Sequence, residues 1–239
     1  MTTGEKIEQG PASWIRGAYE RMEAFFGDLH WWPAETPLEV MVGAILTQNT
    51  AWPNVRKAVE RLKTAGCLSA AAIAALPQEA LAELIRPSGY YNVKARRLKA
   101  FMTWFLEAYG GDEEAMFREE TQVLRERLLK IKGIGDETAD SILLYAGGKP
   151  VFVVDAYTRR ILSRHGLVDG KVSYGDLQDL FMEHLPPSAP LYNQYHALIV
   201  ETGKRFCRKK PRCASCPLGG PEGTALPQRS FLSSSTKTS

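Results

Sequence analysis

Residues 130–140 read KIKGIGDETAD, and this stretch decides how the rest of the chain is interpreted. Apolar residues at helical spacing precede it at Leu124, Leu128 and Ile131. The same spacing returns after it, which predicts two helices joined by a Gly-x-Gly turn. Glycines at 133 and 135 permit a tight turn whose amide N–H groups point outward. Such a turn is often purely structural, but with the helix start that follows it suits an anion.

A second informative stretch lies shortly downstream. Residues 147–150 read GGKP, and an apolar run then leads to Asp155. Because residues 156–162 have helical spacing, Asp155 is a candidate N-cap for a helix that begins just after it.

The whole segment 123–162 resembles the helix-hairpin-helix and Gly/Pro…Asp motif of the endonuclease III superfamily of DNA glycosylases. The resemblance implies that a hairpin grips DNA phosphates through backbone amides and that Asp155 is the catalytic carboxylate. The hairpin residues are Lys132, Gly133, Ile134 and Gly135.

The resemblance departs from the family pattern at one position. Bifunctional members have a nucleophilic lysine two residues after the second hairpin glycine, where this chain has Glu137. A carboxylate cannot form the Schiff base with the sugar that strand cleavage by that route requires. We therefore expect a monofunctional glycosylase without AP lyase activity.

Composition is that of a globular protein with a proper core: 239 residues, 44% of them apolar. The sequence has no apolar run of membrane-spanning length and no signal-peptide pattern, so we expect a cytoplasmic protein. The resemblance implies a nucleoid-associated monomer whose partner is double-stranded DNA with a damaged base. A net charge of +3 is weak evidence for a nucleic-acid partner. Six cations nevertheless gather near the C-terminus: Lys204, Arg205, Arg208, Lys209, Lys210 and Arg212. They suit phosphates or a solvated surface.

Helical spacing recurs along the chain, with no run of alternating strand residues, and predicts an all-α fold. The resemblance adds that this fold is the two-lobed one of the helix-hairpin-helix glycosylases. The expected helices span 13–27, 37–46, 68–76, 78–85 and 93–109, with a further helix capped by Asn49 or Thr50. The expected lobes are a helical barrel at 38–148, which includes the hairpin, and a discontinuous lobe at 1–37 plus 150–206. A cysteine-containing loop at 207–222 and a disordered tail at 223–239 complete the chain.

The start of the 93–109 helix is basic. Lys94, Arg96, Arg97 and Lys99 follow the turn sequence SGYYN. These side chains either position phosphate contacts or form an ordinary solvated face.

Three stretches together resemble the 3-methyladenine DNA glycosylase III branch of the superfamily. They are WWP at 31–33, ILTQNTAW at 45–52 and RPSGYYN at 86–92. In that branch, the equivalents of four residues line the base pocket, and a lysine matched by Lys204 lies near it. The four are Trp31, Trp32, Pro33 and Trp52. The alternative role of the WWP stretch at 31–33 is a hydrophobic lid over the core.

The resemblance also gives Gln48 a role, because relatives use a glutamine here to fill the gap left by a flipped-out nucleotide. Flipping costs a few kcal/mol of stacking and pairing, which such a plug partly replaces. The implied substrate is a flipped-out alkylated purine whose positive charge suits aromatic faces. The alternatives are a glycosylase for oxidised pyrimidines or mismatched bases and a non-catalytic protein that recognises damage.

Three cysteines near the C-terminus resemble the iron–sulfur loop of many superfamily members. Cys207, Cys213 and Cys216 match three of the usual four positions, and residues 217–222 supply no fourth cysteine. The alternatives for the loop are a cluster with Glu222 or an outside fourth ligand, a three-iron cluster, a zinc site or a decayed loop. Any bound cluster would be structural and is not required for the chemistry.

Overall fold

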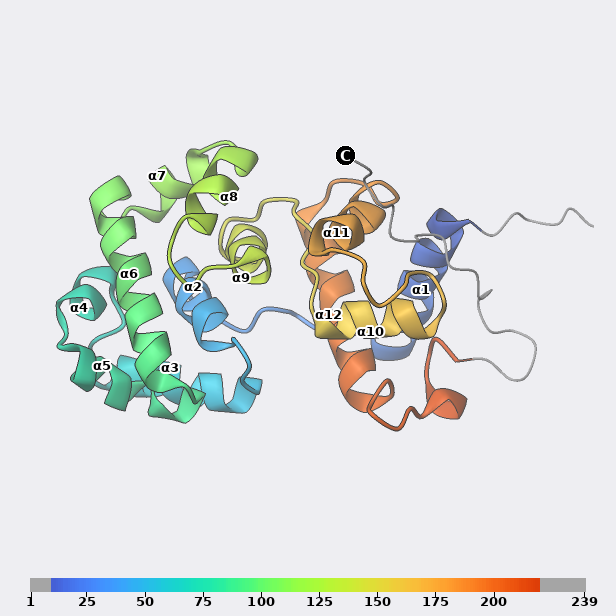
Figure 1. Cartoon of the computed structure of the whole chain (residues 1–239), viewed down its shortest axis with the longest axis horizontal. Coiled ribbons are helices and arrows are strands. Elements are labelled where there is room, and N and C mark those ends of the chain that lie inside the picture. Colours follow the sequence, from blue (N-terminus) through green and yellow to red (C-terminus); the bar gives the residue numbers. More distant parts are fainter. Residues whose placement is uncertain (1–9, 220–239) are drawn as a thin grey trace, which may run out of the picture. The chain divides into compact units, whose positions relative to one another are not determined.

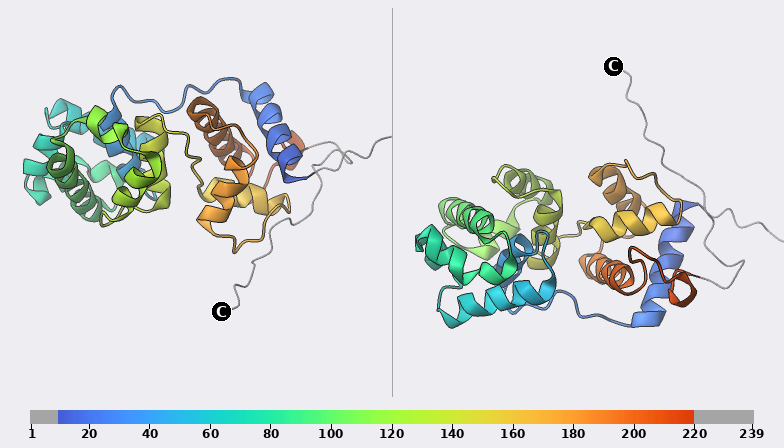
Figure 2. Two further views of the ribbon diagram at one scale, coloured as in Figure 1. Left: turned by 90° about the horizontal axis from the view of Figure 1, so that it is seen from above. Right: turned by 60° about the horizontal axis from the view of Figure 1, so that its bottom comes forward.

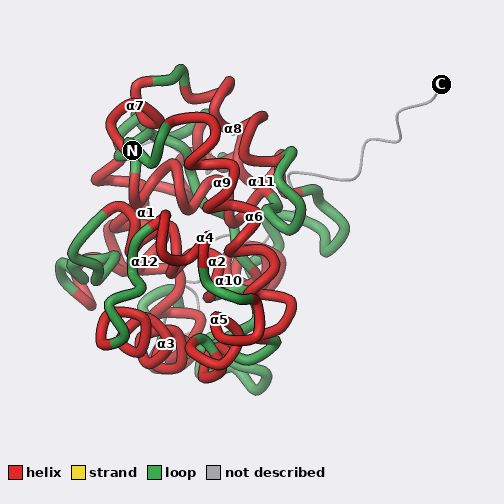
Figure 3. Tube along the Cα trace, turned by 90° about the vertical axis from the view of Figure 1, so that its left-hand side faces the viewer, coloured by secondary structure: helices red, strands yellow, loops and turns green. Residues whose placement is uncertain are grey.

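The computed structural model describes residues 10–219, and within this range the protein is all-α, as the sequence predicts (Figure 1). Figure 3 shows helices and loops in the described part of the chain and no strand. The helices of the first half are α1 (Pro11–Phe26), α2 (Pro37–Leu46), α3 (Trp52–Thr64), α4 (Ala70–Ala75), α5 (Gln78–Leu84), η1 (Arg86–Ser88) and α6 (Tyr91–Tyr109). Those of the second half are α7 (Glu113–Arg118), α8 (Thr121–Leu129), α9 (Asp136–Ser141), η2 (Ile142–Ala146), α10 (Ala156–Arg164), α11 (Tyr174–Met182), α12 (Ala189–Arg205) and η3 (Cys213–Ser215).

Contacts divide the chain into two compact units. The hairpin unit is Trp32–Pro150, and the aspartate unit combines Met1–Trp31 with Val151–Ser239. The lobes expected from the sequence were 38–148 and 1–37 plus 150–206, with 207–222 as a separate loop, whereas no unit boundary follows residue 206. The tail expected at 223–239 and the candidate ligand Glu222 lie outside the described residues.

The core of the hairpin unit forms around α2 and α6. Thr36 caps α2 by accepting a hydrogen bond from the Glu39 amide, and Pro37 suits the first turn of the helix. Every residue from Val40 to Leu46 is buried, since α2 packs against α3, α6, α9 and η2. Helix α6 in turn contacts α4 and α5 through a buried face that includes Leu98, Phe101 and Phe105.

The core of the aspartate unit forms around α12, which packs against α1 and α10 (Figure 2). The Tyr195 ring is fully buried, and its hydroxyl donates to the Ile15 carbonyl at 2.6 Å. Phe152 stacks on Phe181 with ring centroids 4.0 Å apart. These aromatic contacts hold the extended segment before Asp155 between α11 and α12.

One expected cap is wrong. The helix after Thr50 begins at Trp52, with Ala51 as its N-cap and no side-chain hydrogen bond. The Thr50 hydroxyl instead donates to the Ser88 carbonyl, so a tertiary contact replaces the local cap. Within residues 10–219, no helix has the length and hydropathy required to cross a membrane.

Candidate functional site

The hairpin has the tight turn that its glycines predict. Gly133 has φ 94°, and a Cβ there would lie 2.4 Å from the Arg97 Cγ atom, so both the backbone angle and the close approach require glycine. Ile134 is buried, while Lys132 and Gly135 are exposed. Gly135 is the N-cap of α9 and supplies no side-chain acceptor for its first amides. An anion in solution can therefore approach this exposed turn.

An ion-pair network that the sequence analysis missed fixes α8 against α9. Arg125 donates to both carboxylate oxygens of the fully buried Asp140, at 2.7 and 3.1 Å, and to Asp136 at 2.8 Å. These bonds raise the pKa of Arg125. The same arginine offsets the charge of Asp136 at the start of α9, which would otherwise repel an anion.

Gln48 lies against the hairpin. Its amide nitrogen donates to the Gly133 carbonyl at 3.1 Å and to the Thr138 hydroxyl at 2.9 Å, and its oxygen accepts from Arg97. The next residue, Asn49, is exposed and has φ 53°. The loop between α2 and α3 is therefore tied to the hairpin through Gln48 and presents Asn49 to solvent.

Lys94 stabilises the same loop between α2 and α3 through hydrogen bonds. Its side chain is buried, and its ammonium donates to the Leu46 carbonyl at 2.8 Å, the Thr50 hydroxyl at 2.6 Å and the Ser88 carbonyl at 2.6 Å. Burial, and secondarily the charge of Arg97, lowers the pKa of Lys94 to about 8. Neither role expected for the basic start of α6 fits Lys94, because this lysine faces neither phosphate nor solvent.

Two of the predicted pocket residues meet in the hairpin unit. The Trp32 ring lies 4.8 Å from Trp52, edge to face, and 5.0 Å from Tyr145. Gly43 leaves room for it, since a Cβ there would lie 3.3 Å from Trp32 Cζ2. Pro33 is exposed. Tyr145, which was not predicted from the sequence, joins this aromatic cluster from η2.

The other predicted pocket residues meet in the aspartate unit. The Lys204 ammonium lies 5.4 Å from the centroid of the Trp31 ring, within cation–π distance, and Glu201 accepts from it at 3.3 Å. Trp31 also lines a surface hollow of ≈ 580 Å³ whose acidic lining residues are Glu23 and Asp28.

Asp155 is the N-cap of α10, as predicted. Its Oδ1 atom accepts from the Thr158 amide at 2.8 Å and the Thr158 hydroxyl at 3.0 Å, while the Asp155 amide donates back to that hydroxyl at 3.3 Å. The other oxygen, Oδ2, lies 3.7 Å from His196 Nε2. His196 was not among the residues predicted from the sequence, although a single histidine within the buried run YHALIV of α12 was a usable signal.

The Asp155 carboxylate is held in its ionised form. Burial alone would raise its pKa, but His196 and the Thr158 hydrogen bonds together outweigh burial, so the pKa lies below its ordinary value. An ionised carboxylate that is only 11% exposed can stabilise a nearby positive charge or accept a proton from water.

The cysteine loop gathers three thiols. Cys207 is buried and accepts from Arg164 at 3.3 Å, and Cys213 and Cys216 flank η3. The pKa of Cys216 is raised by burial and also by the nearness of the other two thiols. Within residues 10–219, no three histidine, cysteine or acidic side chains are arranged to hold a metal ion. Cys67 belongs to the other unit, so the thiols do not complete the four-ligand set of a four-iron cluster.

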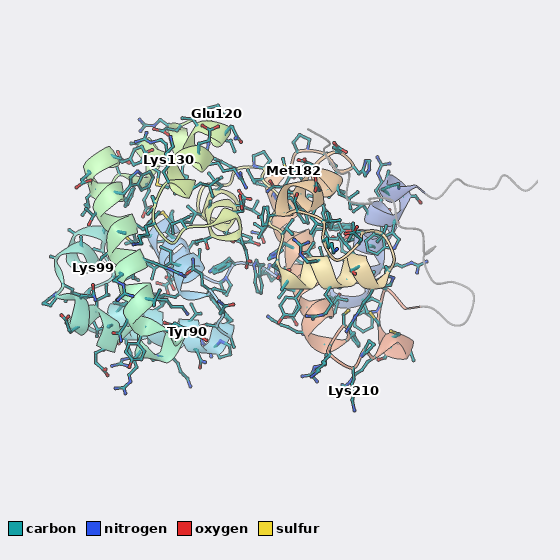
Figure 4. All side chains as sticks on the ribbon, viewed as in Figure 1. Tyr90, Lys99, Glu120, Lys130, Met182 and Lys210 are labelled. Carbon is teal, nitrogen blue, oxygen red and sulfur yellow. The ribbon has the colours of Figure 1, made fainter. Side chains whose placement is uncertain are left out.

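The basic cluster lies at the end of α12 and in the loop that follows. Arg208, Lys209, Lys210 and Arg212 are exposed, and the Lys210 side chain projects from the loop (Figure 4). Arg160 of α10 holds the loop by donating to the Cys207 carbonyl at 2.7 Å and to the Gly203 carbonyl at 3.1 Å.

Comparisons with known proteins identify the family. Residues 42–187 match the HhH-GPD superfamily base excision DNA repair protein family. A Methanocaldococcus jannaschii protein with a provisional name as a DNA repair glycosylase is 49% identical over 201 residues, which are 84% of this chain and 91% of that protein. Endonuclease III of Thermotoga maritima is 29% identical over 181 residues. The match covers 75% of this chain and 79% of that protein.

Two solved structures resemble this one. The H. pylori 3-methyladenine DNA glycosylase bound to 1,N6-ethenoadenine is 33% identical with a TM-score of 0.71, and the match covers 82% of this chain and 97% of that one. Endonuclease III trapped as a covalent intermediate with DNA is 25% identical with a TM-score of 0.75. That match covers 87% of this chain and 93% of the endonuclease chain. The chain belongs to the HhH-GPD superfamily and is a base excision repair DNA glycosylase of the endonuclease III type.

Proposed function

We propose that the protein is a monofunctional DNA N-glycosylase that hydrolyses the glycosidic bond of flipped-out alkylated purines of the 3-methyladenine type. The aromatic cluster of Trp32, Trp52 and Tyr145 is the observation that carries this choice of substrate. The H. pylori relative, whose structure contains an ethenoadenine, supports it.

Charge explains why aromatic rings suit such a base. A 3-alkylated adenine is cationic, and cation–π contacts are worth about 0.5–2 kcal/mol each. Trp31 gives one example of such a contact in this protein, since its ring lies within cation–π distance of the Lys204 ammonium. An oxidised pyrimidine is neutral and non-planar and would gain less from these faces.

The chemistry that we assign to Asp155 follows from its two oxygens. Oδ1 is committed to capping α10, whereas Oδ2 makes no bond to Thr158. Because the alkylated base leaves readily, the carboxylate is required mainly to stabilise positive charge on the sugar, to activate water, or both. Glu137 stands where a bifunctional member has lysine, so no Schiff base forms there.

DNA binding is assigned to the hairpin, with Lys132, Gly133, Ile134 and Gly135 as its residues. The exposure of Lys132 and Gly135 and the clamp by Arg125 support this assignment. Double-stranded DNA with a damaged base is the proposed partner, and the protein is proposed to act as a monomer in the nucleoid-associated cytoplasm.

A pair of substrates tests the substrate class. Single-turnover base release is measured from duplexes that contain methylated purines or thymine glycol, with wild type and W52L. We expect wild type to release the methylated purine. W52L should release it at least about 5-fold more slowly, because one aromatic face is removed. Faster release of thymine glycol, unchanged in W52L, would assign the protein to oxidised pyrimidines instead.

Gln48 is proposed to fill the gap left by the flipped nucleotide, with its hydrogen bonds to the hairpin exchanged for contacts to the duplex. The exposed Asn49 is the matched comparison. Flipping is followed by the fluorescence of a 2-aminopurine placed beside the lesion. We expect Q48A to lower the flipped fraction and N49A to leave it unchanged; the opposite pattern would move the role to Asn49.

The cysteine loop is proposed to bind an iron–sulfur cluster with a structural role, and the effect of Cys207 and Cys213 on the pKa of Cys216 supports this. Binding requires the three thiols to move closer together, since the described residues hold no metal site as they stand. The fourth ligand would have to come from outside the described residues, and the reaction above uses no cluster. Iron and sulfide analysis of the purified protein tests the cluster. Stoichiometric iron that is lost in C213S would support it, and an iron-free, active protein would reject it.

A further inference from the structure

Asp155 has a second titratable side chain beside it. Its Oδ1 atom is occupied twice by Thr158, so Oδ2 is the oxygen left for chemistry, and this atom is the one that faces His196. The Nε2–Oδ2 distance is 3.7 Å, and the two side chains are only 7% and 11% exposed. Electrostatic interactions between side chains that are so little exposed are screened far less than those at the surface.

We propose that His196 is a positioning residue that keeps the Oδ2 atom of Asp155 ionised and directed for catalysis. This inference rests on the proposed function, because it takes Asp155 to be the group that acts on the glycosidic bond. His196 itself touches neither sugar nor base in this scheme and acts only through Asp155.

The packing of α10 against α12 holds the pair in place. Gly203 lies two turns after His196 and therefore on the same face of α12. A Cβ at Gly203 would lie 2.3 Å from the Tyr157 Cδ1 atom, so glycine is what lets the ring of α10 lie directly against α12. Arg160 adds its hydrogen bond to the Gly203 carbonyl. Two helices in direct contact thus fix the separation of Asp155 and His196.

The other titratable groups nearby are committed elsewhere. Arg159 donates to the Val172 carbonyl, and Arg160 to two carbonyls of α12 and its loop. From α11, the Tyr174 hydroxyl accepts from the Val154 amide at 3.3 Å, and from α12 the Tyr195 hydroxyl donates to Ile15. Among the described residues, His196 is the one ionisable side chain that lowers the pKa of Asp155.

The sign of the effect follows from burial. Without His196, the desolvation of Asp155 is opposed by Thr158 alone, so its pKa rises and the carboxyl becomes protonated at a higher pH. The fall of the base-release rate at low pH, which is the acid limb of its pH profile, must then move to higher pH. A histidine that only fills space would leave this limb where it is.

The test uses single-turnover release of methylated purines from duplex DNA across pH, with wild type, H196F, H196Q and the control H184Q. We expect the acid limb to move up by about one pH unit in H196F and by less in H196Q, which retains a donor. The dissociation constant for the duplex should stay constant, and H184Q should match wild type. An acid limb that stays in place in both His196 variants would overturn the proposal.

A double-mutant cycle on the free energy of unfolding tests the pair without measuring enzyme activity. The free energy of unfolding in urea is measured at neutral pH for wild type, H196F, D155N and the double variant. Non-additive effects support the pair, and additive effects overturn it. Non-additivity in a protein that releases no base from any duplex would keep the pair and reject the proposed function, so the two failures are distinguishable.

Discussion

Asp155 combines a structural and a chemical role in one side chain, with one oxygen for each. The substitution Asp155→Asn separates these roles, because asparagine is as good an N-cap as aspartate but carries no charge. We expect D155N to retain the fold and the affinity for DNA while base release falls by at least about 10²-fold. Thermal unfolding and DNA binding serve as the controls, and turnover at the wild-type rate would remove Asp155 from the mechanism.

Lys94 predicts a pH dependence of stability. Its pKa in the folded state is about 8, below the ordinary 10.5, so between these values the unfolded chain binds more protons than the folded one. This group therefore makes the folded state more stable as the pH rises through the window. Subtracting the unfolding free energy of K94M from that of wild type should give a difference that grows between pH 8 and pH 10. A difference that is constant or falls would contradict the assignment.

Some roles of single residues could be predicted from the sequence and others could not. The role of Asp155 as an N-cap was predictable, because the residue and its helix are adjacent in the chain. The inward orientation of Lys94 was not, because its three acceptors come from two other segments. His196 was missed for the same reason: its partner Asp155 belongs to a different helix.

At the scale of elements, the hairpin depends on the contact between α8 and α9. Asp140 is fully buried, and Arg125 compensates its charge. Removing one partner of a buried pair typically costs about 3–5 kcal/mol, so R125M should lower the free energy of unfolding by that amount and weaken DNA binding with it. Urea unfolding and a DNA titration measure both effects.

A second substitution supplies the control for R125M. Replacing the buried carboxylate as well, in R125M/D140N, should recover much of the lost stability, because no uncompensated charge is left inside. Equal stability of R125M and wild type would show that Arg125 does not hold the two helices together. The helices themselves were predictable from local apolar spacing, but this clamp, which spans the turn, was not.

At the scale of the whole molecule, the residues with proposed roles are distributed over both units. The hairpin, Gln48, Trp32 and Trp52 belong to one unit, and Asp155 and His196 to the other. The all-α fold and the family could be predicted because the hairpin motif is contiguous in sequence. The aromatic cluster could be predicted only in part, since Tyr145 joins Trp32 through tertiary packing.

Base release from a duplex that carries methylated purines, scored for strand breaks with and without alkali, tests the central claim most directly. We expect wild type to release free base and to leave strands that break only after alkali, and D155N to release the base at least about 10²-fold more slowly. Strand breaks without alkali would contradict the account, because they would require a lysine nucleophile in place of the one that Glu137 replaces.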